Sequence, residues 1–311
     1  MKRFIIRILI FLFPVVLLLG AWEVLMHNFP HVLNYKRTVI TEQCRANGEA
    51  LFLGSSHSYF GINTDTIPNA YNLGFVSQNL NQDRLIFEHF LSKPNKLKYV
   101  LIPVSLFSFF TSKADEEKWR TVNYVRYWHF PAQNVTDYFF VLDKIPLQLK
   151  YVQKTARKIR KKGLNKVLSC SPTGWGEDYA EARDFSLFKK LGKKGAARHG
   201  NVNLNDIKYF YALKDIIQLA EKNNIKVILF TPPAHQSYYT NISQLQENKM
   251  RKLLSEITDR KRVFYLDLLR SDNFVDQDFF DPDHMSHRGA KKLASTLYTF
   301  YKNINGNIPA K

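Results

Sequence analysis

Short apolar runs that alternate with helix-like segments constrain the fold of this chain more than any other feature of its sequence. Runs of strand length occupy residues 50–54, 70–74, 99–105, 226–230 and 263–268. Apolar residues recur with helical spacing in 77–91, 206–223, 242–258 and 286–301. Strands separated by helices of this length pair in parallel through right-handed crossovers. The sequence therefore predicts an α/β fold, a three-layer α/β/α sandwich with a mainly parallel sheet.

The alternation is lost between about 111 and 203, which we interpret as an insertion. Its first part is rich in aromatic residues, and its second part holds eight Lys and Arg residues between Lys150 and Lys166 with no acidic residue among them. Two interpretations of this basic run stay open. It is either a solvated helix face or a surface for an anionic lipid or polymer.

The N-terminus predicts a membrane segment. Lys2 and Arg3 precede a run of 19 residues, 4–22, that is apolar except for Arg7. This is about the length of a helix that crosses the hydrocarbon core. The basic leader predicts a cytoplasmic N-terminus and an extracytoplasmic remainder, periplasmic or at the cell surface. A cleaved signal peptide is the alternative, but Leu19 stands where a small residue is expected before a cleavage site, which favours a single-pass anchor.

These features divide the 311 residues into three expected parts. Residues 1–26 form the membrane anchor or signal segment, and 27–49 form a linker. Residues 50–311 form the α/β domain, which carries the aromatic and basic insertion.

The formal charge of +18, from 45 Lys and Arg against 27 Asp and Glu, favours anionic partners. We expect a membrane and an envelope polysaccharide or other acidic polymer, and no nucleic acid, because no nucleic-acid-binding motif is present. The two cysteines, Cys44 and Cys170, lack metal-ligand spacing, and they are either one disulfide or two thiols.

A serine stands at the end of the first predicted strand, in the turn Gly54-Ser55-Ser56. Asp281 and His284 follow the last predicted strand, and the carboxyl ends of parallel strands meet at one edge of a sheet. We therefore predict Ser56 as nucleophile, His284 as base and Asp281 as the carboxylate that orients the imidazole. Asp283 is an alternative orienting carboxylate, and Ser56 as a plain helix cap is the structural alternative.

Other polar groups also follow predicted strands. Gly74 follows the second strand, Ser105 the third and His235 the fourth, while His57 adjoins the serine. We expect His57 and His235 to line the site.

A metal site is the competing interpretation of the last block. Asp281, Asp283, His284 and His287 form a dense group of metal-binding side chains. Because His-x-x-His does not place both rings on one helix face as well as His-x-x-x-His does, we predict no metal and no cofactor.

The residues named above resemble the SGNH, or GDSL-like, hydrolase superfamily. Gly54-Ser55-Ser56 resembles its first block, with Ser55 where an aspartate is usual. Asn72-Leu73-Gly74 resembles the second block, and the segment from Asp281 to Gly289 resembles the last, with Met285 in place of proline. The resemblance implies a Ser-His-Asp triad and an oxyanion hole made by the amides of Ser56 and Gly74.

The third block departs from that pattern. Where the family has Gly-x-Asn-Asp, this chain has Pro103-Val104-Ser105-Leu106, so the asparagine donor to the oxyanion is absent. Loss of one such donor costs about 2.7–4 kcal/mol in the transition state. The Ser105 hydroxyl is the local substitute, with His57 and His235 as alternatives.

The Gly-Ser-Ser opening and the anchor are similar to the envelope branch of the superfamily, which includes the DltD proteins of teichoic-acid D-alanylation and the alginate and cellulose acetylation proteins. This resemblance implies a serine O-acyltransferase or carbohydrate esterase acting on an envelope or exported polysaccharide, with a multi-pass membrane protein as acyl donor. The alternative is a non-catalytic scaffold on the same fold that binds a glycan or anionic polymer.

Overall fold

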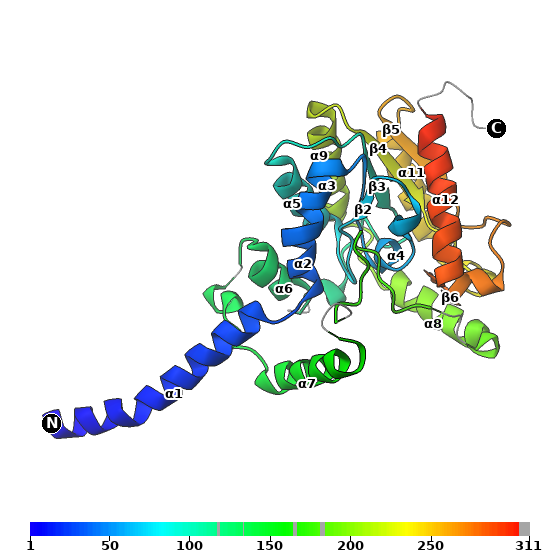
Figure 1. Cartoon of the computed structure of the whole chain (residues 1–311). Coiled ribbons are helices and arrows are strands. Elements are labelled where there is room, and N and C mark those ends of the chain that lie inside the picture. The colour runs from blue at the N-terminus through cyan, green and yellow to red at the C-terminus, as the bar shows by residue number, and fades with distance from the viewer. Residues whose placement is uncertain (117–118, 133, 164–166, 181–183, 305–311) are drawn as a thin grey trace. The chain divides into compact units, whose positions relative to one another are not determined.

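The computed structural model describes residues 1–116, 119–132, 134–163, 167–180 and 184–304 (Figure 1). The chain forms two compact units. The N-terminal unit consists of Met1–Tyr35 and Lys118–Leu168, and the sheet unit consists of Lys36–Glu117 and Ser169–Lys311. These boundaries differ from the expected parts, because half of the insertion belongs with the N-terminal helix and the second half of the expected linker belongs with the sheet.

The sheet unit is built on five parallel strands in the order β2-β1-β3-β4-β5. They are β1 (Ala50–Phe52), β2 (Ala70–Asn72), β3 (Tyr99–Pro103), β4 (Lys226–Thr231) and β5 (Val263–Asp267). All five coincide with predicted strands, and the predicted α/β fold with a parallel sheet is confirmed.

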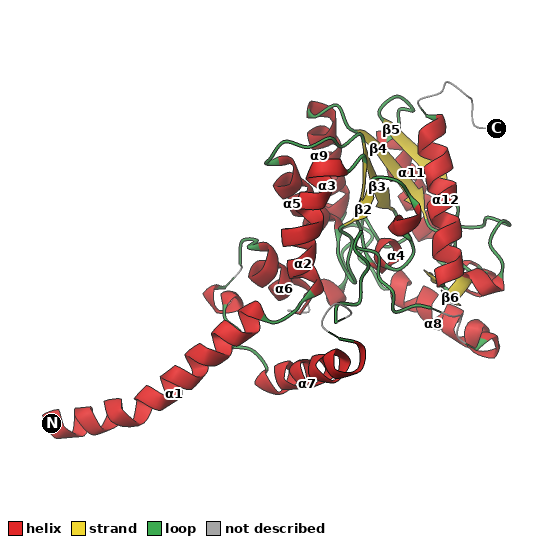
Figure 2. Ribbon diagram, in the orientation of Figure 1, coloured by secondary structure: helices red, strands yellow, loops and turns green. Residues whose placement is uncertain are grey.

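Helices cover both faces of this sheet. Figure 2 shows α3 (Thr41–Asn47), α5 (Leu80–Leu91) and α9 (Lys208–Lys222) on one side and α12 (His287–Asn303) on the other. Alternate residues of the strands pack against α12, since successive side chains of a strand point to opposite faces. This buried cluster includes Phe52, Leu101, Ile228, Phe230, Leu293, Leu297 and Tyr301. The core therefore holds the strand ends, and the loops that follow them, in fixed positions.

The sheet unit also contains further helical elements and a pair of short strands. They are η1 (Lys36–Ile40), α4 (Ser56–Tyr59), η2 (Thr64–Thr66), η3 (Lys113–Glu116), η6 (Phe185–Leu187), α8 (Phe188–Gly200), α10 (Gln236–Tyr239), α11 (Gln244–Ile257), η7 (Asp276–Asp278), β6 (Phe279–Asp281) and β7 (His284–Met285). An isolated antiparallel bridge joins Thr111 to Asn203, at the two ends of the predicted insertion.

The N-terminal unit is helical. It contains α1 (Lys2–Asn28), α2 (Val32–Tyr35), α6 (Trp119–Trp128), η4 (Val135–Tyr138) and α7 (Ile145–Lys162). Helix α1 has 27 residues, and its most apolar stretch has a mean hydropathy of 2.7 and no buried residue. By length and composition it can span a membrane, although a signal sequence has the same properties.

Candidate active site

The turn that carries Ser56 is fixed by its neighbours. Gly54 has a φ of +109°, and a Cβ at this position would lie 2.5 Å from the Pro103 ring, so only glycine fits. The Gly54 amide donates to the buried carboxylate of Asp83 at 2.8 Å, and Gln78 Nε2 donates to the same oxygen at 2.6 Å. Burial outweighs these bonds and raises the pKa of Asp83 to about 7. The turn therefore presents Ser56 at the first residue of α4.

A chain of hydrogen bonds links Ser56, His284 and Asp281. Ser56 Oγ lies 2.9 Å from His284 Nε2, and His284 Nδ1 lies 2.9 Å from Asp281 Oδ1. The antiparallel pair β6–β7 sets Asp281 opposite His284, which explains the second contact. With the Nδ1 proton held by Asp281, the lone pair of Nε2 faces the serine hydroxyl. The structure thus brings together all three residues that the sequence assigned to catalysis.

The environment of His284 favours its protonated form. Burial lowers its pKa, but the carboxylates of Asp283 and Asp281 outweigh burial and raise the pKa above 6.5. A histidine with a raised pKa accepts a proton from a neighbouring hydroxyl more readily, and it cannot accept one while it is already protonated.

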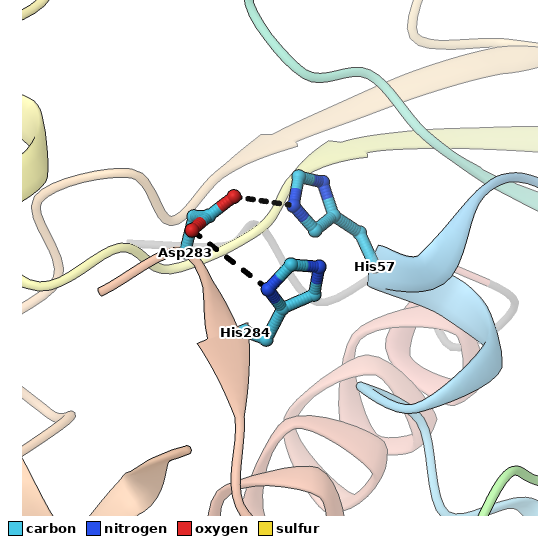
Figure 3. A group of neighbouring side chains, drawn as sticks. All are labelled: His57, Asp283 and His284. Atoms are coloured by element: carbon cyan, nitrogen blue, oxygen red, sulfur yellow. Dashed lines mark ion pairs between the residues drawn. The ribbon is translucent and has the colours of Figure 1, made fainter. Parts of the chain in front are cut away.

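Asp283 is the centre of a second polar group (Figure 3). Its Oδ1 lies 3.7 Å from His284 Nδ1, while its Oδ2 lies 3.9 Å from His57 Nε2, 3.7 Å from His199 Nε2 and 3.3 Å from Arg198 Nη2. Despite burial, which raises it, the pKa of Asp283 lies well below its usual range because His284, His57 and His199 surround the carboxylate. Asp281 is close enough to orient His284 by a hydrogen bond, whereas Asp283 acts on it through charge.

The two additional histidines are held by hydroxyl groups. His57 Nδ1 lies 2.6 Å from Ser105 Oγ, and His199 Nδ1 lies 2.7 Å from the Tyr238 hydroxyl. Burial lowers the pKa of both rings, that of His199 to about 3. Both histidines are therefore neutral near pH 7 and direct Nε2 toward Asp283.

Helix α8 delivers Arg198 and His199 to this group. It packs closely on α10, where a Cβ at Gly192 would lie 2.3 Å from the carbonyl oxygen of Ser237. A glycine at this position is what allows the two helices to approach.

Two of the expected oxyanion donors make internal hydrogen bonds. The Gly74 amide donates to Asn72 Oδ1 at 2.9 Å, because the buried Asn72 side chain folds back over its own turn. The Ser105 hydroxyl is paired with His57. Among the described residues, the amide of Ser56 is left as the expected donor without an internal partner.

A small open pocket lies on the Asp283 side of the site. Its lining includes His57, Ser105, Tyr238 and Asp283 together with Pro232, Pro233 and Leu269. His57 and Ser105 thus both border this pocket.

His235 does not face this pocket. Its Nε2 lies 3.1 Å from Asp276 Oδ1 and its Nδ1 lies 2.8 Å from Ser237 Oγ, so both nitrogens are used at the start of α10. Its backbone amide donates to the carbonyl oxygen of Pro282 at 2.9 Å and so supports the segment that carries His284.

The side chains that could hold a metal ion differ from those suggested by the sequence. His287 Nε2 lies 3.0 Å from the carbonyl oxygen of Glu177, outside the group. The ligand atoms of His57, Asp283 and His284 lie within 4.8 Å of one another. A metal bound there would use His284, and would compete with its hydrogen bonds to Ser56 and Asp281. Cys44 and Cys170 are not joined by a disulfide.

Sequence reasoning missed His199, Arg198 and Lys36. The Lys36 side chain is fully buried, and Nζ donates to the carbonyl oxygens of Asn72 at 2.8 Å, Gly74 at 2.6 Å and Gly174 at 2.8 Å. Burial lowers the pKa of Lys36 to about 7, while three carbonyl oxygens around Nζ favour its charged form. None of the three residues belongs to a local motif, so only the folded chain reveals them.

A family model described as "Protein of unknown function (DUF1574)" matches residues 35–301. The chain belongs to the DUF1574 family. The DUF1574 match includes every strand and the three residues Ser56, Asp281 and His284. No curated protein sequence matches this DUF1574 chain.

Two solved structures are similar to this DUF1574 protein at low identity. A GDSL-like lipase from Bacteroides thetaiotaomicron is 13% identical with a TM-score of 0.38, over 89% of this chain and 100% of that one. An active site mutant of a family two carbohydrate esterase from Clostridium thermocellum is 10% identical with a TM-score of 0.37, over 84% and 65%. Because both TM-scores are below 0.5, the fold of this chain rests on its own parallel sheet.

Proposed function

We propose that this DUF1574 protein is a serine acylesterase or acyltransferase of the SGNH type. The hydrogen-bonded chain from Ser56 through His284 to Asp281 carries the proposal, since both of its distances are 2.9 Å. A neutral imidazole between a hydroxyl and a carboxylate is the arrangement that activates a serine.

In the first half of the reaction, Ser56 Oγ attacks the carbonyl carbon of an acyl ester and His284 Nε2 takes the hydroxyl proton. Asp281 stabilises the resulting imidazolium, and the Ser56 amide donates to the developing oxyanion. His284 then passes the proton to the departing alcohol oxygen as the ester bond breaks. The product is an ester of the acyl group with Ser56.

In the second half, His284 takes a proton from an acceptor hydroxyl, whose oxygen attacks the acyl carbon. His284 then returns the proton to Ser56 Oγ as the bond between the acyl carbon and this oxygen breaks. Water as the acceptor makes the protein an esterase, and a sugar hydroxyl makes it a transferase. The anchor-like α1 and the resemblance to the envelope branch support a membrane-anchored, extracytoplasmic protein that acts on an envelope polysaccharide and receives its acyl group from a multi-pass membrane partner.

A specific observation favours the second candidate, a non-catalytic module that binds a glycan or an anionic polymer. The amide of Gly74 and the hydroxyl of Ser105, both expected oxyanion donors, are engaged within the protein. Under the catalytic proposal, substrate binding has to release one of them or the reaction relies on the Ser56 amide.

The decisive experiment treats the full-length protein in detergent with a fluorophosphonate probe and maps the label by mass spectrometry. We expect a covalent label on Ser56, lost in Ser56→Ala and in His284→Ala. Ser55→Ala is the matched control, since it removes the neighbouring hydroxyl and leaves the hydrogen-bonded chain intact.

Ester hydrolysis is then measured with p-nitrophenyl acetate on the same three variants. A folded wild-type protein that takes no label at Ser56 and shows no hydrolysis above His284→Ala contradicts the catalytic proposal. Glycan binding that is retained in Ser56→Ala then identifies the binding module.

A further inference from the structure

Within the N-terminal unit, hydrogen bonds hold one end of α1 against segment 138–151. Glu23 accepts hydrogen bonds from the amides of Phe140 at 3.0 Å and Val141 at 2.9 Å. Trp22 Nε1 donates to Gln148 Oε1 at 2.7 Å, and the Tyr151 hydroxyl donates to the carbonyl oxygen of Pro30 at 2.6 Å. Segment 138–151 therefore has a fixed position along α1.

That position lies at the end of the stretch of α1 that is apolar and long enough to span a membrane. A helix rises about 1.5 Å per residue, so the stretch from Phe4 to Glu23 spans about 30 Å, the thickness of a hydrocarbon core. If α1 crosses the bilayer from Phe4, it leaves the hydrocarbon near Trp22 and Glu23. These are the residues that hold segment 138–151.

Segment 138–151, together with the residues just before it, exposes apolar side chains. Val135 is 72% exposed, Leu142 59% and Leu147 57%, and Tyr138, Phe139 and Leu149 are also exposed. Six such side chains within fifteen residues are a costly arrangement in water, and aromatic and leucine side chains are favoured at membrane interfaces.

A basic stripe continues from this apolar segment along α7. Lys150, Lys154, Arg157 and Lys161 are exposed, and their spacing of three or four residues places them on one side of the helix. Gln148 and Thr155 are buried on another side. One side of α7 is therefore buried against the rest of the unit, and another side is exposed and cationic.

No acidic residue of the unit neutralises this stripe within the described part of the chain. Residues 118–168 hold twelve Lys and Arg residues against Asp137 and Asp143, which is +10 of the total +18. Asp143 pairs with Arg126 at 3.1 Å, and Asp137 is buried and accepts from the Asn134 amide at 3.2 Å. Glu23 accepts the hydrogen bonds of the two amides described above. The charge of the four stripe residues is therefore available to a partner.

We propose that residues 135–161 form a membrane-interface surface, in which the exposed apolar side chains enter the headgroup boundary and the α7 stripe binds anionic phospholipid headgroups. A charged face beside an apolar one is the combination by which peripheral helices bind lipid. A soluble acidic polymer would match the charge but not the exposed leucines. This inference does not depend on the serine chemistry.

The test uses the full-length chain reconstituted in vesicles of phosphatidylcholine with 30% phosphatidylglycerol, roughly the anionic content that attracts basic segments. In a background with Cys44→Ala and Cys170→Ser, a fluorescent label is attached at Leu142→Cys. The control label is at Leu245→Cys in α11, an apolar position that is 69% exposed. We expect several-fold stronger quenching by spin-labelled lipids at position 142 than at 245.

The charge component is tested by replacing Lys150, Lys154, Arg157 and Lys161 with Gln. Quenching at position 142 should fall, and replacement of the four exposed α8 residues Lys189, Lys190, Lys193 and Lys194 should leave it unchanged. Equal, weak quenching at 142 and 245 overturns the proposal. So does a label at 142 that responds to a soluble acidic polysaccharide and not to the vesicles.

Discussion

Two carboxylates contact the same imidazole, and they contribute in different ways. Asp281 is within hydrogen-bond distance of His284 Nδ1 at 2.9 Å, whereas Asp283 is at 3.7 Å and also faces His57, His199 and Arg198. Asp281 therefore determines which nitrogen of His284 carries the proton. Asp283 determines how strongly that proton is held.

The pH dependence of activity separates these roles. His284 has to be neutral to accept the serine proton, so kcat/KM should fall as the pH decreases through its raised pKa, above 6.5. Removal of a negative charge makes imidazolium less stable, so Asp283→Asn should move this acidic limb to lower pH and reduce the plateau by roughly tenfold or less. The measurement is kcat/KM for an activated ester between pH 5 and pH 9.

Asp281→Asn provides the comparison. Loss of the direct acceptor allows the wrong tautomer, which in the serine protease triad lowers kcat by about 10⁴. An acidic limb that does not move in Asp283→Asn, or a similarly large loss in both variants, contradicts the division of roles.

Lys36 is the other residue whose burial has a measurable consequence. Lys36→Met leaves three carbonyl oxygens without their donor, and we expect the free energy of unfolding to fall by about 2–5 kcal/mol. Urea denaturation measures this change. Lys98→Met is the control, because Lys98 is an exposed side chain paired with Glu49, and it should change stability by about 0.5 kcal/mol or less.

The lowered pKa of Lys36 determines the direction in which stability changes with pH. Between about 7 and the ordinary value of 10.5, unfolded Lys36 binds a proton that the folded form does not, so this group makes stability rise with pH across that window. The gap between wild type and Lys36→Met should widen from pH 7 to pH 9. A gap that stays constant from pH 7 to pH 9 would show that the buried amine stays charged.

The sequence was sufficient to place Ser56, Asp281 and His284 together, since each follows a strand and the ends of parallel strands share an edge. It could not place His199 or Lys36, because a side chain from a helix or loop outside the strands reaches the site only through tertiary packing. Nor could it show that the Gly74 amide faces Asn72, since that depends on one side-chain rotamer.

At the level of elements, periodicity predicted the sheet and its covering helices. Runs such as Lys226–Thr231 are apolar, β-branched and ended by prolines, and α9 and α12 repeat their apolar residues at helical spacing. The insertion has no such pattern. Its helices α6 and α7 pack mainly within the N-terminal unit, whereas α8 packs on α10, a division that composition does not encode.

The packing of α8 on α10 gives an element-scale prediction. Gly192→Ala places a Cβ 2.3 Å from the Ser237 carbonyl oxygen, so α8 has to move away and withdraw His199 from Asp283. Overpacking of this kind costs about 1–3 kcal/mol, partly offset by the better helix propensity of alanine. The variant should unfold at a lower temperature and hydrolyse an ester more slowly than wild type.

Gly195→Ala in the same helix is the matched control. Its Cβ would meet Tyr238 at 3.4 Å, an ordinary contact, so the variant should be as stable as wild type or slightly more so. Equal stability of the two variants would show that the close approach at Gly192 is not required.

At the level of the whole molecule, the two units have different compositions. The N-terminal unit has an apolar helix, exposed aromatic and leucine side chains and most of the excess positive charge, while the sheet unit has the core and the serine. The total charge of +18 predicted an anionic partner. Only the structure shows that the basic stripe of α7 lies in the same compact unit as the membrane-type helix.

The contacts of Lys36 also limit how the chain can be shortened for work in solution. A truncation at the apparent start of the domain, residue 50, would remove α1 together with Lys36, the buried Cys44 and the buried Arg45. The carbonyl oxygens of Asn72, Gly74 and Gly174 would then face an empty space beside the proposed catalytic turn. A soluble version that reports faithfully on catalysis therefore has to begin before residue 36, and an inactive fragment that starts at 50 would say nothing about Ser56.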